Sequence, residues 1–216
     1  MDLQRAKQLV AQGESKTIEF KRKVAHPDKI VKELVAFANT AGGYLFIGVD
    51  DDGSIPGLKF PEDEVFAMDE AIKKYCHPIP KYKQEIVPIS SKKSLVVYHI
   101  PSGQNKLHYL RQNQHMKHGM AFVRVDDESV KASKEVKEIF RRRWTNRNIQ
   151  FNFGDKEKFL MEYLQEHDNI TLKEFRKLAQ LNYYKASKTL IILVLANILT
   201  VTPSGKRDIY RLKNNY

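Results

Sequence analysis

The chain has 216 residues, a length that suits one ordinary domain with a smaller second domain. Its hydrophobic content of 42% is enough for a packed core, but no stretch approaches the ~18 consecutive apolar residues of a membrane span. One cysteine, Cys76, excludes an intramolecular disulfide framework, and the polar first residues lack the apolar segment of a signal peptide. We therefore expect a cytoplasmic protein with no membrane partner.

The net charge of +11 is concentrated towards the C-terminus. Residues 1–133 hold 20 Lys and Arg against 17 Asp and Glu, a net charge of +3, whereas residues 134–216 hold 17 against 9, a net charge of +8. Such an excess predicts that the last third of the chain meets a polyanion. A solvated basic face on a protein with another role fits the composition equally well.

Apolar periodicity predicts an α+β module in the first two thirds of the chain. The expected helices span 1–12, 28–40, 61–75 and 133–144, and the expected strands span 17–21, 44–49, 84–89, 94–100 and 120–125. Asp28 is the expected N-cap of the second helix, and 102–119 reads as a loop. In the first strand, Ile18 and Phe20 would face inward, opposite Glu19 and Lys21. The pattern indicates a mixed sheet with helices packed on it.

The last third has a different organisation. Helices are expected over 155–167 and over 183–197. Between them, a turn at 169–171 leads into another helix, which Thr171 caps. Strands at 199–202 and 208–212 flank a basic turn. Three short helices followed by a hairpin are typical of a small winged helix-turn-helix domain. The predicted boundaries are therefore 1–135 for the first domain, 136–154 for a basic connecting helix and linker, and 155–216 for the second domain.

In a winged helix the third helix reads nucleic acid, and the hairpin tip contacts the neighbouring backbone. Exposed polar side chains that could read base edges or bind phosphates occur in these places and in the connecting helix. The candidates are Asn182, Tyr184, Lys185 and Lys188 on the helix, Lys206 and Arg207 on the hairpin, and Arg141, Arg142 and Arg143 before the linker. A winged helix that only braces or dimerises the protein is the alternative.

A second group of candidate residues is acidic. Glu14, Glu19 and Asp51, with Lys21 nearby, could converge if the strands at 17–21 and 44–49 are neighbours. Carboxylates that converge in this way would bind Mg²⁺ or Mn²⁺, and such a metal could activate water against a phosphodiester. In the alternative, Glu19 pairs with Lys21 or Lys23 and the aspartates only shape a turn.

Several of these segments together resemble one known family. The motifs are Glu14–Phe20, Phe37–Gly43, Ile47–Asp51, Gly57–Leu58 and the tail Ala121–Val125 with Ser129–Ser133. Over roughly residues 7–135 the chain resembles the Schlafen-like AlbA-type domain, also described as a DNA-binding or divergent AAA-type domain. Bacterial members with a C-terminal winged helix are described as transcriptional regulators, and the resemblance implies that role here.

The same resemblance implies a second activity. In animal Schlafens that cleave tRNA, the nuclease residues match Glu14, Glu19 and Asp51 of this chain. Those proteins also carry a Cys/His zinc site, for which this chain offers only Cys76 and His77. In addition, they form their cleft from two related lobes, whereas this chain has one. A comparable cleft would here require a homodimer. We expect no ATP binding, because no Gly-Lys-Ser/Thr follows the glycine pair at 42–43.

The sequence thus favours a dimeric DNA-binding transcriptional regulator that needs no cofactor, with RNA as another nucleic-acid partner. The alternative is an endoribonuclease that uses Mg²⁺ or Mn²⁺ at Glu14, Glu19 and Asp51. A protein-interaction module with neither role is the third reading.

Overall fold

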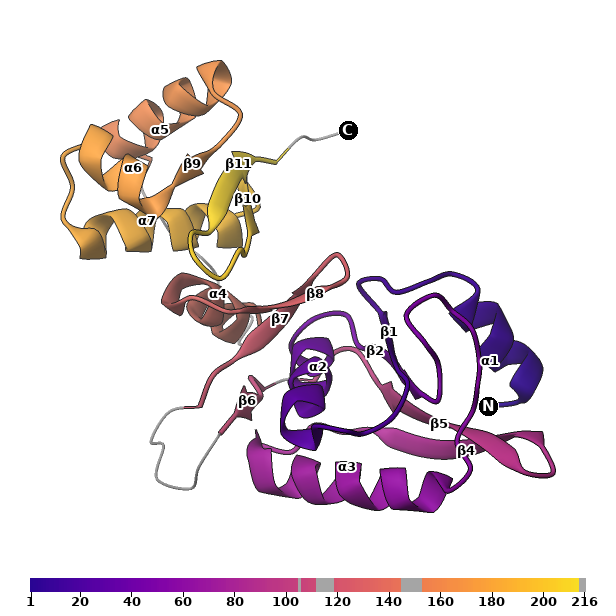
Figure 1. Cartoon of the computed structure of the whole chain (residues 1–216). Helices are drawn as coiled ribbons and strands as arrows, with labels where there is room; N and C mark the ends of the chain where they lie inside the picture. The colour runs from indigo at the N-terminus through magenta and orange to yellow at the C-terminus, as the bar shows by residue number, and fades with distance from the viewer. Residues whose placement is uncertain (105, 112–118, 145–152, 214–216) are drawn as a thin grey trace. The chain divides into compact units, whose positions relative to one another are not determined.

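The structure is a computed structural model that describes residues 1–104, 106–111, 119–144 and 153–213 (Figure 1). The chain divides into two compact units, an N-terminal unit of Met1–Val130 and a C-terminal unit of Lys131–Tyr216. The finer boundaries at 135 and 154 stay predictions, and residues 145–152 of the expected linker lie outside the described residues. In the described ranges no helix is long and apolar enough to cross a membrane.

Four strands form the main sheet of the N-terminal unit, in the spatial order β1-β2-β5-β4. Their bounds are Ile18–Lys21 for β1, Gly43–Ile47 for β2, Lys83–Ser90 for β4 and Lys93–Ile100 for β5. Strand β1 runs parallel to β2, whereas the β2–β5 and β4–β5 pairs are antiparallel. The predicted mixed sheet is confirmed, and the apolar run after residue 43 forms an interior strand.

Helices cover both faces of this sheet. They are α1 (Leu3–Val10), α2 (Pro27–Asn39) and α3 (Pro61–Tyr75). Helices α2 and α3 share one core with Leu45 and Tyr98, and α3 lies alongside β5 (Figure 1). Helix α1 packs on the other face against Phe46. Glu19 lies opposite Ile18 as expected, but α2 covers that face too, so Glu19 is only 7% exposed.

The sequence missed several short elements of this unit. Cys76–His77 (β3) pairs with Tyr109–Leu110 (β6), inside the expected loop, and Glu128–Lys131 (β8) pairs with Phe122–Val125 (β7), which lies within the expected strand 120–125. Strands of two to four residues are too short to show a period-2 pattern. The expected N-cap of α2 was also wrong: the helix begins at Pro27, one residue before Asp28. Proline suits this first position because its fixed φ is already helical and no intrahelical partner is needed for the missing N–H.

The C-terminal unit contains the three predicted helices and the hairpin. Its elements are α4 (Lys134–Trp144), α5 (Asp155–Glu166), β9 (Ile170–Thr171), α6 (Leu172–Leu178), α7 (Tyr183–Leu195), β10 (Leu199–Thr202) and β11 (Ile209–Leu212). Residues 169–171 were expected to form only a turn, but Ile170 and Thr171 pair with β11 and complete a sheet in the order β10-β11-β9. Ile170 is fully buried, so packing against the core explains this difference.

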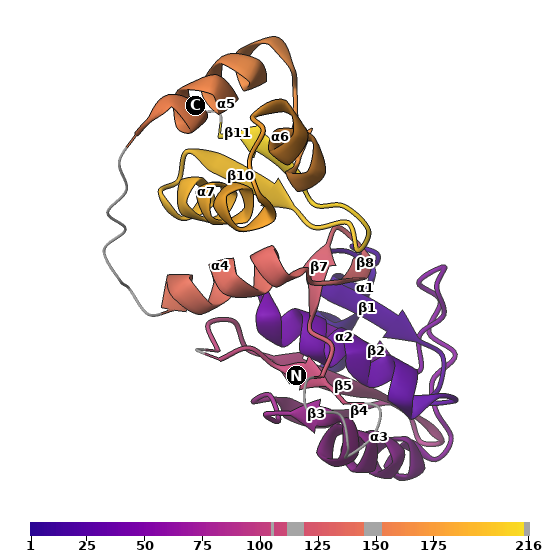
Figure 2. The ribbon, with the colours of Figure 1, turned by 90° about the vertical axis from the view of Figure 1, so that its left-hand side faces the viewer.

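The core of this unit lies between its helices and the small sheet. Leu160 of α5, Phe175 of α6, Leu190 of α7 and Tyr210 of β11 are all fully buried in one cluster. Helix α7 runs beside β10, as Figure 2 shows from the side. Thr171 caps α6 through its hydroxyl, which accepts from the backbone N–H of Glu174, as the sequence predicted.

The first glycine of the pair at the start of β2, Gly42, serves close packing. Gly42 has a φ of +75°, and a Cβ built on it would lie 2.5 Å from the carbonyl oxygen of Ile100 and 2.6 Å from the amide nitrogen of Ser102. Both neighbours are backbone atoms that cannot move aside cheaply. The turn between α2 and β2 therefore requires glycine for its conformation and for its space.

Replacing Gly42 with Ala should destabilise the N-terminal unit more than replacing Gly103. Gly103 has nearly the same φ, +74°, but nothing lies within 4 Å of its added Cβ. Gly103→Ala thus measures only the cost of placing a Cβ at a left-handed φ. Gly42→Ala should lose a further ~1–3 kcal/mol of unfolding free energy, because its Cβ also overpacks the neighbouring backbone. Urea unfolding of both variants gives the comparison, and equal losses of unfolding free energy would contradict the packing argument.

Candidate functional site

A buried arginine holds together the carboxylates that the sequence singled out. The Arg124 side chain is 0% exposed, and its Nη1 donates to Oε2 of Glu19 and Oε2 of Glu33, each at 2.9 Å. Its Nη2 donates to the carbonyl oxygen of Ser15 at 2.6 Å, and the Ser129 hydroxyl donates to Glu33. We call these five residues the Arg124 cluster. It joins β1, α2, β7 and β8.

Lys21 occupies the other side of Glu19. Its Nζ lies 2.5 Å from Oε1 of Glu19 and 3.9 Å from Oε1 of Glu14. Glu14 also accepts the backbone N–H of Phe20 at 2.8 Å. Burial raises the pKa of Glu19 and the nearby Glu33 carboxylate adds to this, while Lys21 and Arg124 oppose the shift. The Glu19–Lys21 pair that the sequence allowed is thus present.

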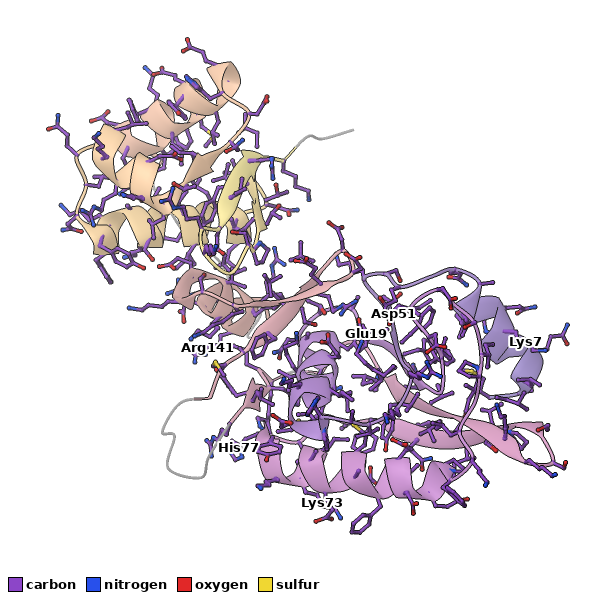
Figure 3. The ribbon with its side chains drawn as sticks, viewed as in Figure 1. Lys7, Glu19, Asp51, Lys73, His77 and Arg141 are labelled. Carbon is purple, nitrogen blue, oxygen red and sulfur yellow. The ribbon has the colours of Figure 1, made fainter. Side chains whose placement is uncertain are left out.

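Asp51 belongs to the turn after β2. Figure 3 labels it together with Glu19 of β1. The backbone N–H of Asp50 donates to the carbonyl oxygen of Ser54, and that of Gly53 donates to the carbonyl oxygen of Asp50. The Asp52 carboxylate also closes the turn, because it accepts from the N–H of Ser54 at 2.8 Å. Asp51 itself is exposed. The structure thus brings Glu14 and Glu19 together around Lys21 and places Asp51 in an exposed turn.

The donor set at Glu19 does not fit a divalent metal. Both oxygens of Glu19 already accept from cations, Oε2 from Arg124 and Oε1 from Lys21. A metal ion at this place would meet two positive charges on the same carboxylate. Across the described ranges, no group of three or more His, Cys, Asp or Glu side chains is arranged to hold a metal ion. The chemistry of this arrangement is that of a buried ionic cross-link.

Sequence reasoning missed the two residues that organise this cluster. Arg124 interrupts the apolar run of β7, and Glu33 interrupts the apolar stripe of α2, yet as whole residues, backbone included, they are only 3% and 6% exposed. Both residues stand at positions where the apolar periodicity predicts burial, and they carry opposite charges. This combination is the signal from which an Arg124–Glu33 ion pair could have been predicted. Charged residues are rarely buried unless they are paired.

The nucleic-acid candidates lie in the C-terminal unit. Along α7, Tyr184, Lys185 and Lys188 are exposed, whereas Ala186 and Leu190 face the core. Tyr184 is 71% exposed. Asn182 is the N-cap of this helix.

That cap uses the side-chain Oδ1 of Asn182, which accepts the backbone N–H of Lys185 at 2.8 Å. This oxygen therefore contributes to helix stability, and the exposed side chains of Tyr184, Lys185 and Lys188 are the ones directed at solvent.

The hairpin loop is close to the start of α7. Lys206 and Arg207 of the loop and Tyr183 of α7 line the same cavity, so the predicted hairpin residues lie near the first turn of the helix. Both loop cations are exposed.

The three arginines of α4 are also exposed, but two of them have acidic partners. Arg141 and Arg142 pair with Glu138, at 3.7 Å and 2.8 Å. These pairs reduce the net positive charge that α4 presents.

Comparisons with known proteins match the N-terminal part of the chain. The model of the family Schlafen, AlbA_2 matches residues 14–133, which is more than half of the chain. The crystal structure of the DIP2311 protein from Corynebacterium diphtheriae is 15% identical, with 71% of this chain and 35% of that chain covered and a TM-score of 0.47. This chain thus spans about a third of the DIP2311 chain.

A second solved structure is the solution NMR structure of the N-terminal domain of a RecG-related protein from Nitrosomonas europaea. It is 24% identical, with 56% of this chain and 88% of that chain covered and a TM-score of 0.41. At these TM-scores neither likeness bears on function.

Replacing Arg124 with Met should strongly destabilise the N-terminal unit, because Glu19 and Glu33 would be left buried without their shared cation. Removing one partner of a buried ion pair costs about 3–5 kcal/mol. The control is Arg22→Met, since Arg22 is 73% exposed beside Asp50 and should change the unfolding free energy by less than about 1 kcal/mol.

A triple variant sharpens this test. With Glu19→Gln and Glu33→Gln added to Arg124→Met, no uncompensated carboxylate stays in the cluster, so part of the lost stability should return. Equal stability of the Arg124→Met and Arg22→Met variants in urea would contradict the assigned role.

Proposed function

The chain belongs to the Schlafen, AlbA_2 family, whose model matches residues 14–133, and on this premise we propose that it binds nucleic acid, with duplex DNA favoured, through its C-terminal unit. The observation that carries the proposal is that the basic hairpin loop lies beside Tyr183 in the first turn of α7, the helix on which Tyr184, Lys185 and Lys188 are exposed. We propose transcriptional regulation as the role that this binding serves.

The order of elements supports a winged helix-turn-helix. Helices α5, α6 and α7 precede the hairpin of β10 and β11, and β9 closes the small sheet. In such a domain α7 is the recognition helix, and the β10–β11 loop is the wing. The buried side of α7 fixes the helix in the core, so its opposite side is held in a defined orientation towards a partner.

The side chains on that face suit a phosphate backbone. Lys185 and Lys188 are three residues apart and thus share one side of α7. Lys206 and Arg207 add two cations from the loop, and Tyr184 adds a hydroxyl and a ring. Residues 134–216 carry a net charge of +8, which would attract a polyanion over a distance.

The N-terminal unit would supply dimerisation in this proposal. Two-fold dimers are the commonest closed assembly of soluble proteins. A dimer would set two α7 helices at a fixed spacing on a duplex, as dimeric helix-turn-helix proteins do.

Duplex DNA should bind with a salt dependence that falls when Lys185 and Lys188 are changed to Ala. Each phosphate contact contributes about 0.9 to the slope of log affinity against log salt, so the double variant should lose roughly 2 from that slope. Fluorescence anisotropy with a labelled duplex between low and moderate salt gives the slope.

The matched control is Lys156→Ala/Lys158→Ala, which removes the same charge from exposed positions of α5. Its slope should equal that of the parent protein. If both double variants lower the slope equally, binding follows net charge and not the α7 face. Absence of duplex binding at low salt would contradict the proposal.

Structured RNA should stay intact when incubated with the protein and Mn²⁺, because both oxygens of Glu19 are held by cations. The informative variant is Asp51→Asn, since Asp51 is exposed and lies outside the Arg124 cluster. Glu19→Gln would also remove a partner of Arg124. Cleavage by the parent protein that Asp51→Asn abolishes, in a gel assay, would restore the endoribonuclease alternative.

A further inference from the structure

Helix α4 packs against the helix that we propose reads nucleic acid. It lies beside α7 (Figure 2), and Ile139 of α4 is 1% exposed in the same core cluster as Leu190 and Val194 of α7. This contact leaves Lys185 and Lys188 exposed to solvent. Helix α4 therefore supports α7 from a side other than the one that carries the two lysines.

A buried carboxylate forms the polar part of this helix contact. Glu135 of α4 is 4% exposed, and its Oε1 accepts from the Tyr183 hydroxyl at 2.8 Å and from the Ser187 hydroxyl at 2.7 Å. Tyr183 is the first residue of α7, and Ser187 lies one turn later. A single oxygen of Glu135 thus holds the first two turns of α7 at two points.

The two hydroxyls depend on Glu135 as their acceptor. Ser187 is only 8% exposed, so little water can take the place of the carboxylate. Burial raises the pKa of Tyr183 to about 12, and its hydrogen bond to Glu135 adds to this shift, so the tyrosine hydroxyl stays protonated and donates. Loss of the Glu135 carboxylate would therefore release the start of α7.

The hairpin loop is connected to the same end of α4. Ser133, the residue before α4, accepts the backbone N–H of Val136 at 3.0 Å. Burial raises the pKa of Asp208, which directly follows the loop cations, and a hydrogen bond from the Ser133 side chain opposes this shift. Ser133 and Glu135 also line one cavity with the loop. The first turn of α4 thus contacts both parts of the proposed nucleic-acid surface.

We propose that Glu135 is a positioning residue for nucleic-acid binding, which fixes the start of α7 through Tyr183 and Ser187 so that Lys185 and Lys188 meet the duplex together with the loop. The inference rests on the proposed function and adds α4 to the elements that this function needs. Glu135 acts from the interior and does not itself contact the duplex.

Electrostatics alone predicts the opposite effect of removing this residue. Residues 134–216 carry a net charge of +8, and a variant without Glu135 is more positive by one charge. A more positive unit attracts a polyanion more strongly. A loss of duplex affinity in Glu135→Ala therefore has to come from the position of α7 and cannot come from net charge.

Fluorescence anisotropy of the full chain with a labelled duplex at low salt measures this effect. Glu135→Ala should weaken binding roughly 10-fold, because two hydrogen bonds to the start of α7 are lost. Ser187→Ala should weaken it by a smaller factor, and should have little further effect when Glu135 is already Ala, since the two residues act through one contact. Glu135→Gln keeps an acceptor oxygen in place and should bind within about 2-fold of the parent.

The matched control is Glu138→Ala, which removes the same charge from α4 at a residue that pairs with Arg141 and Arg142. This variant should bind the duplex as tightly as the parent or more tightly. Hydrogen–deuterium exchange without nucleic acid gives a second readout, in which the amides of residues 183–187 should exchange faster in Glu135→Ala than in Glu138→Ala. Thermal melts report that each variant is folded at the temperature of the assay.

Two results would overturn the inference. One is duplex binding by Glu135→Ala that is as tight as that of the parent, and the other is equal exchange at residues 183–187 in Glu135→Ala and Glu138→Ala. A parent protein that binds no duplex would contradict the proposed function instead, and the exchange comparison would still decide whether Glu135 fixes the start of α7.

Discussion

The fold of the N-terminal unit depends on a buried positive charge. The Arg124 side chain, which has no solvent exposure, needs the carboxylates of Glu19 and Glu33 beside it, and both of these buried carboxylates need Arg124. Their mutual dependence fixes β7 against β1 and α2, three segments that lie far apart in the sequence. The segment that matches the family model begins at Glu14 and ends at residue 133, so the Arg124 cluster connects the two ends of that segment. Motif residues from the start and from the end of the matched segment therefore contact one another in the folded protein.

The contacts of this cluster also determine which groups surround the acidic candidate residues. The resemblance to animal Schlafens matches Glu14 and Glu19 to nuclease residues, but in this chain Lys21 lies beside both carboxylates and Arg124 beside Glu19. The Glu19 carboxylate, which is paired on both oxygens, stabilises the sheet edge. The basic C-terminal unit then offers the candidate residues, because its cations on α7 and on the hairpin loop are exposed, and the loop lies beside Tyr183 at the start of α7.

Apolar periodicity was sufficient to predict the long helices and strands, but it could not predict which charged residues are buried as ion pairs. The helices α2, α3 and α7 and the strand β2 follow from apolar spacing, since each buries a full stripe or run. The burial of Glu19 did not follow, because whether a second layer covers the other face of a sheet is decided by distant segments. Strand β9 was missed for a similar reason, since two residues join a sheet only once β11 is in place. Tyr210 reads as a core aromatic in sequence, and only the structure shows that its hydroxyl has no partner.

Hydrogen–deuterium exchange of the full chain, with and without a saturating duplex, tests the central claim most directly. The account predicts added protection at the start of α7, around Asn182–Lys188, and in the loop around Lys206 and Arg207, because duplex contact would bury these backbones. It predicts no added protection around Glu14–Lys21 or the turn at Asp51. Protection confined to those two acidic segments, with α7 and the loop unchanged, would contradict the account and direct attention to the N-terminal unit as the nucleic-acid site.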